Sequence, residues 1–183
     1  RKPAQAALTR LLSGHGCAKT WATAAPQYRK RMFLKGGETG KRRGIVREKV
    51  QAEVERVFPH WSAELPGWGM MLSCRCFAHE EAGNYTLAEG AGRMAIEVDP
   101  GDLWGAHAVA HVLEMQGRRS EGIDWLKRLE PNWEGANNLK HHLFWHRAMF
   151  HLERREFSEV LSLYDHGFRD LGSPLTLAMP DMY

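Results

Sequence analysis

The fold is decided by residues 83–100, which read GNYTLAEGAGRMAIEVDP. Small and apolar residues recur in this stretch at spacings of three and four, which places them on one face of a helix. Gly83 precedes the run and Pro100 follows it, and both residue types end helices. The stretch therefore predicts one amphipathic helix with defined ends. Its apolar face is expected to hold Ala88, Ala91, Ala95 and Ile96.

Working outward, the chain predicts more helices and shows no strand-like alternation, so the expected fold class is all-α. A short helix is expected over residues 4–12, and a longer one from Ile45 until Pro59 stops it. Further helices are expected from the turn at Pro66-Gly67 to Glu81 and over 103–116. Two more are expected over 120–129, with Ser120 as its cap, and from a cap at Asn137 or Asn138 to Glu153. The last is expected over 157–164, with Val160 and Leu161 toward the core.

These helices come in pairs that repeat along the chain. Gly83 and Gly117 are 34 residues apart, as are Glu80 and Glu114, and a third unit follows at an offset of 38. A period near 34 with two antiparallel helices per unit is typical of tetratricopeptide repeats. We therefore expect helix hairpins stacked into a right-handed, tetratricopeptide-like solenoid, because a single hairpin cannot bury its apolar face alone. The units lie near 66–100, 101–136 and 137–170.

The composition is that of a globular protein that does not span a membrane. Hydrophobic residues make up 43% and charged residues 26% of the 183 residues, and no apolar run approaches the roughly 20 residues of a membrane helix. Three cysteines, two of them in a C-x-C pair, do not form a disulfide framework. Reduced thiols indicate a cytoplasmic protein.

Charge is distributed unevenly. Residues 1–44 contain 11 of the 25 Lys and Arg residues and one acidic residue, Glu38. A basic arm can bind nucleic acid, but this one lacks regularly interleaved aromatic residues, and we expect no nucleic-acid partner. Residues 1–44 are interpreted as a poorly packed segment or a separate part of the chain, and residues 45–183 as the helical repeats.

Two pairs of histidines stand at helical spacing. His107 and His111 are four residues apart in HAVAHVLEM, and His142 and His146 are four apart in HHLFWHRAM. Each pair lies on one face of the first helix of its unit. Neighbouring first helices pack together, so all four imidazoles could converge and bind Zn²⁺, Fe²⁺ or Mn²⁺. Glu114 and Trp145 are expected on the same groove-facing surface.

Three segments resemble one family in their order along the chain. VFPHWSAELPGW (57–68), PGDLWGAHAVAHVLEM (100–115) and KHHLFWHRAMFHLERREFSEVLSLYD (140–165) are similar to the tetratricopeptide-repeat protein 38 family and its bacterial relatives. The resemblance covers about residues 45–183. It implies helical repeats and a longer protein with further repeats on both sides.

The sequence leaves two functions open. The first is a scaffold that binds a protein or peptide in its concave groove, with His107, His111, Glu114, His142, Trp145 and His146 as candidate contacts. The alternative is a metal-dependent enzyme or small-molecule-binding protein that uses the four histidines, with the metal activating water. No catalytic motif is complete, so no catalytic residue is assigned.

Overall fold

The computed structural model describes residues 38–168, and within them every regular element is helical. The expected all-α class is therefore confirmed. The helices are α3 (Glu38–Val57), α4 (Trp68–Glu81), α5 (Tyr85–Val98), α6 (Leu103–Met115), α7 (Arg119–Leu129), α8 (Leu139–Glu153) and α9 (Phe157–Leu163). Single turns follow three of them: η1 (Phe58–His60), η2 (Glu130–Asn132) and η3 (Tyr164–Phe168).

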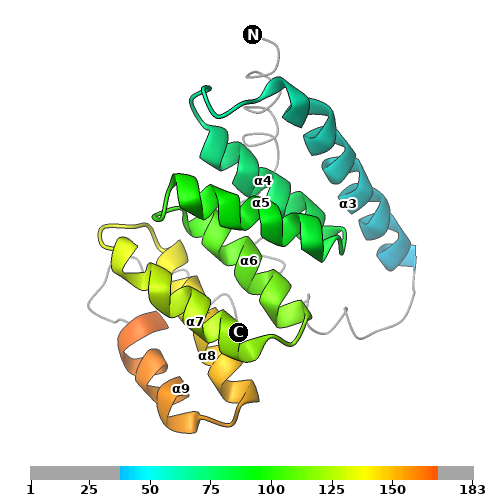
Figure 1. Cartoon of the computed structure of the whole chain (residues 1–183). Helices are drawn as coiled ribbons and strands as arrows, with labels where there is room; N and C mark the ends of the chain where they lie inside the picture. Colours follow the sequence, from blue (N-terminus) through cyan, green and yellow to red (C-terminus); the bar gives the residue numbers. More distant parts are fainter. Residues whose placement is uncertain (1–37, 169–183) are drawn as a thin grey trace.

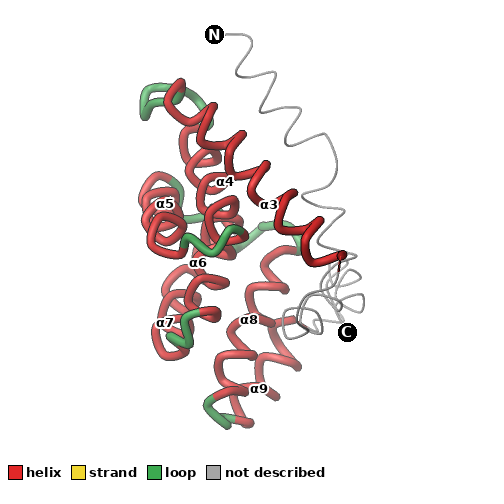
Figure 2. Tube along the Cα trace, turned by 90° about the vertical axis from the view of Figure 1, so that its right-hand side faces the viewer, coloured by secondary structure: helices red, strands yellow, loops and turns green. Residues whose placement is uncertain are grey.

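Helices that are consecutive in the sequence are neighbours in space. From α3 to α9 each helix packs against the next, and the whole series runs down the long direction of the molecule (Figures 1 and 2). In addition, α6 contacts both α4 and α8. The second contact places α6 and α8 side by side, and it is between these two helices that the candidate site lies.

The same turn closes α4, α6 and α8. The residues at the turn have a left-handed backbone, with φ of 79° at Gly83, 69° at Gly117 and 61° at Arg155. In each case the next residue donates its N–H to a carbonyl five positions earlier, which is the Schellman arrangement. These bonds join Asn84 to His79 (2.8 Å), Arg118 to Leu113 (2.8 Å) and Glu156 to His151 (3.0 Å). The spacings of 34 and 38 residues thus correspond to a repeated structural feature, and the predicted roles of Gly83 and Gly117 are confirmed.

One main core joins the helices from α4 to α8. Its largest fully buried side chains include Leu113 of α6, Leu126 of α7 and Phe150 of α8. The helix expected over residues 83–100 is present as α5, and its predicted apolar face is buried. That face comprises Ala88, Ala91, Ala95 and Ile96.

Three predicted helix details are wrong. The first long helix begins at Glu38 rather than Ile45 and passes through Gly44, since one glycine inside a helix costs only about 1 kcal/mol. Arg118, not Ser120, is the N-cap of α7, because the turn at Gly117 fixes where the next helix starts. In α9, Leu161 is 63% exposed; Leu163 is buried instead and packs with Ala148, and Val160 is half-buried beside them.

The remaining predicted ends agree with the structure. The helices up to Glu81 and over 103–116 appear as α4 and α6, and Asn138 is the N-cap of α8. The capping hydrogen bond comes from the neighbouring residue, since Asn137 Oδ1 accepts from Leu139 N at 2.9 Å. The expected helix over 4–12 lies outside the described residues. Within the described part of the chain, no helix combines the length and apolar character needed to cross a membrane.

Candidate metal centre

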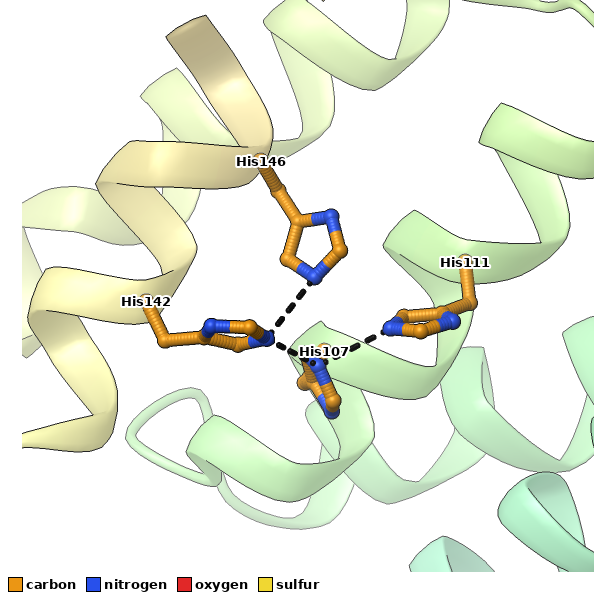
Figure 3. A group of neighbouring side chains, drawn as sticks. All are labelled: His107, His111, His142 and His146. Carbon is orange, nitrogen blue, oxygen red and sulfur yellow. Dashed lines mark hydrogen bonds between the residues drawn. The ribbon is translucent and has the colours of Figure 1, made fainter. Parts of the chain in front are cut away.

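Four histidines from two helices converge between α6 and α8. His107 and His111 project from α6, and His142 and His146 project from α8 (Figure 3). Each pair is spaced by four residues, so its two rings lie one turn apart on the same helix face. The packing of α6 against α8 then brings the two pairs together. Each ring can offer a nitrogen such that all four nitrogens lie within 4.8 Å of one another.

The Nε2 atoms form a continuous chain of short contacts. His111 Nε2 lies 3.0 Å from His107 Nε2, which lies 2.9 Å from His142 Nε2, which in turn lies 3.0 Å from His146 Nε2. The rings therefore present the same atom toward a common centre (Figure 3). The four ring nitrogens by themselves make a set of four metal ligands.

Burial favours the neutral form of two of the imidazoles. His107 is 0% and His146 2% exposed, whereas His111 is half-buried. Burial and then the neighbouring imidazoles hold the pKa of His107 well below its usual value, and burial followed by His146 does the same for the pKa of His142. Neutral imidazole is the form that binds a metal.

Protons alone cannot satisfy these contacts. A neutral imidazole Nε2 carries either one proton or one lone pair, so it makes one well-aligned hydrogen bond. Four such atoms in a chain make at most two hydrogen bonds, and there are three contacts of 2.9–3.0 Å. At least one of the three contacts is then left without a well-aligned hydrogen bond. A cation at the centre would bind all four nitrogens at once, because all four lone pairs could point at it.

Two of the imidazoles have a carboxylate near their Nδ1 atom. Glu114 Oε2 of α6 lies 3.1 Å from His146 Nδ1 of α8. Glu80 Oε1 of α4 lies 3.7 Å from His111 Nδ1 of α6. Burial, and secondarily the charge of Glu81, raises the pKa of Glu80 to about 8. Both carboxylates face the Nδ1 side of a ring, away from the common centre.

Two tryptophans border the cluster. Trp145 stacks on His142 with ring centroids 5.3 Å apart and an interplanar angle of 17°. Trp104 meets His107 edge-on at 5.9 Å. The stacked contact limits the rotation of the His142 ring, and the edge-on contact limits the rotation of the His107 ring.

The structure thus brings together all six residues that the sequence singled out. The six side chains differ in how far they are buried. Three are buried (His107, His142 and His146), and three are partly exposed (His111, Glu114 and Trp145). The sequence did not place Glu80 in the site. Its spacing of 34 residues from Glu114 is the signal that could have identified it.

No family model matches the chain, and no solved structure matches it.

Proposed function

We propose that this protein binds one divalent transition-metal ion through His107, His111, His142 and His146. The observation that carries the proposal is the convergence of four imidazole nitrogens, largely buried, within 4.8 Å of one another. Isolated buried histidines usually pair with a carbonyl or carboxylate, whereas here the Nε2 atoms face each other and the carboxylates face Nδ1.

The donor set and its size favour a first-row ion such as Zn²⁺ or Fe²⁺. Imidazole nitrogen suits zinc, copper, iron and nickel, while Mn²⁺ prefers oxygen ligands. A zinc–nitrogen distance of about 2.0–2.1 Å separates tetrahedral ligand nitrogens by about 3.3 Å. The three contacts of 2.9–3.0 Å would open by a few tenths of an ångström around the ion, and the other pairs of nitrogens, which lie within 4.8 Å, would adjust to the same separation.

The arrangement fits a structural ion better than a catalytic one. Structural zinc sites have four protein ligands, whereas catalytic sites have three and keep one position open. Here four histidines offer four ligand nitrogens, two from α6 and two from α8. The bound ion would cross-link the second and third helix pairs and stabilise the folded state, since a ligand of the native state alone adds to its stability.

Metal content tests this proposal. The full chain is expressed without a histidine tag, and its metals are quantified by plasma mass spectrometry. We expect close to one equivalent in the wild type and in His60→Ala, a control that removes an exposed histidine. His111→Ala, which removes the partly exposed ligand, should lose most of it. The metal-free wild type should gain thermal stability with Zn²⁺, by about 4 kcal/mol at a thousandfold excess over Kd. Sub-stoichiometric metal together with no stabilisation by Zn²⁺, Fe²⁺ or Mn²⁺ would contradict the proposal.

We also propose that the helix pairs form a tetratricopeptide-like stack, as in the family that the sequence resembles. Support comes from the identical turns at Gly83, Gly117 and Arg155 and from the adjacency of α4, α6 and α8. In such a stack a protein or peptide could bind the groove, and the partly exposed Trp145 would be a contact. Trp145→Ala should then abolish binding of the partner.

A further inference from the structure

We infer that Glu114 and Glu80 are positioning residues of the metal centre. Each faces the Nδ1 atom of one histidine and thereby directs that ring's Nε2 lone pair at the ion. This inference rests on the proposed metal binding for its effect on affinity, but not for the state of the histidine rings.

The contact of Glu114 is a hydrogen bond between neighbouring helices. Its Oε2 lies 3.1 Å from Nδ1 of His146, whose side chain is 2% exposed. Because the oxygen of a carboxylate only accepts, the proton of this bond belongs to Nδ1. A neutral imidazole that carries its proton on Nδ1 has a lone pair on Nε2. His146 is thus prepared for the metal by a residue three positions after the other ligand pair on α6.

Glu80 makes a similar but longer contact one helix pair earlier. Its Oε1 lies 3.7 Å from Nδ1 of the half-buried His111, which is an ion-pair distance rather than a hydrogen bond. Glu80 is 8% exposed, and among the described residues none hydrogen-bonds its Oε2. The carboxyl therefore has acceptor capacity that the surrounding protein does not use.

Glu80 and Glu114 occupy equivalent positions in their repeats. The N–H of Gly83 bonds to the Glu80 carbonyl, and the N–H of Gly117 bonds to the Glu114 carbonyl, as parts of the same helix-ending turn. Each side chain reaches forward to a histidine on the next first helix, from α4 to α6 and from α6 to α8. A contact made twice from equivalent positions is explained by the helix stack itself rather than by a chance encounter of two side chains.

These contacts would act on affinity in two ways. A fixed Nδ1 tautomer removes the cost of moving a proton when the ion binds, and the hydrogen bond to Glu114 makes the His146 imidazole a stronger donor. Loss of such an outer partner lowers metal affinity about 10–100-fold. The shorter contact of Glu114 predicts the larger effect.

Two measurements on Glu114→Ala, Glu114→Gln and Glu80→Gln test the inference. Glu153→Gln is the control, because Glu153 lies on α8 but pairs with Arg119 at the surface. The first measurement, long-range ¹H–¹⁵N NMR of the metal-free full chain, reads the ring tautomers. We expect the Nδ1–H form for His146 in the wild type and in Glu153→Gln, and loss of that preference in Glu114→Ala.

The second measurement is zinc affinity by competition with a chromophoric chelator. We expect about 10–100-fold weaker binding for Glu114→Ala, a smaller loss for Glu114→Gln, whose amide oxygen still accepts, and no change for Glu153→Gln. A proton on Nε2 of His146 in the metal-free wild type overturns the inference, as does zinc affinity of both Glu114 variants within twofold of the wild type. If the wild type binds no metal, the proposed function fails, while the tautomer measurement still decides this inference.

Discussion

Two glycines of α5 allow the packing of α4, α5 and α6 to be tested within a single helix. A Cβ added at Gly92 would lie 2.4 Å from Val109 Cγ2 and 2.7 Å from Cys76 Sγ, and both of these residues are fully buried. A Cβ added at Gly90, half a turn earlier, meets nothing within 4 Å. Neither buried neighbour can yield easily, since Val has a stiff χ1 and the surrounding core is close-packed.

The magnitude follows from comparing the two alanine variants. Both Gly90→Ala and Gly92→Ala gain the same helix propensity, about 1 kcal/mol, so it cancels in their difference. What remains is the overpacking at Gly92, typically about 1–3 kcal/mol. We expect Gly90→Ala to be more stable than the wild type in urea unfolding of the metal-free protein, and Gly92→Ala to be less stable than Gly90→Ala by that amount. Equal unfolding free energies for the two variants would show that α5 does not approach α4 and α6 as closely as the structure has it.

Two further predictions concern single positions. Arg155 is exposed and has φ of 61°, and a residue with a side chain pays about 1–2 kcal/mol for this left-handed backbone conformation. Arg155→Gly should therefore raise the free energy of unfolding, measured in urea, by about 0.5–1 kcal/mol. A variant less stable than the wild type would contradict the left-handed turn at this position. Glu80 has a pKa raised to about 8, so the native state holds a proton that the unfolded chain releases above its ordinary pKa near 4.5. Its contribution to stability is complete below pH 4.5 and is lost as pH rises through 8, which amounts to about 2 kcal/mol between pH 6 and 8. The neutral Glu80→Gln does not titrate, so metal-free Glu80→Gln should gain that much relative to the wild type over this range; a constant difference would refute the raised pKa.

Much of the fold could be predicted because helix-breaking residues are local signals. The ends of α5 were predicted from Gly83 and Pro100, and its buried face from the spacing of its small residues. The errors arose where a neighbour decides the outcome. Ser120 is a good cap by residue type, but the turn at Gly117 had already fixed the helix start. Leu161 is apolar, but α9 presents Leu163 to α8.

The histidine cluster was predicted from two facts: spacing of four within each pair, and adjacency of the first helices in a repeat. Its burial was not predicted. The sequence analysis placed His107 on a groove surface, and the structure gives that side chain no exposed area. Burial depends on how far Trp104, Trp145 and the neighbouring helix close over the rings, and this cannot be read from spacing along one chain.

The repeat also explains why Glu80 and Glu114 share a position while the two histidine pairs do not. Both carboxylates lie three residues before the left-handed residue that ends their helix, at Gly83 and Gly117. The histidine pairs are 35 residues apart, although the turns that end α6 and α8 are 38 apart. Measured from the turn that ends its helix, the pair on α8 therefore lies three residues nearer the start of the helix than the pair on α6 does. Three residues are close to one helical turn, so the pair stays on nearly the same face. A search for identical residues at the repeat period finds the carboxylates and misses the imidazoles they contact. The ligand set becomes visible only when the helix face, rather than the position in the repeat, is compared.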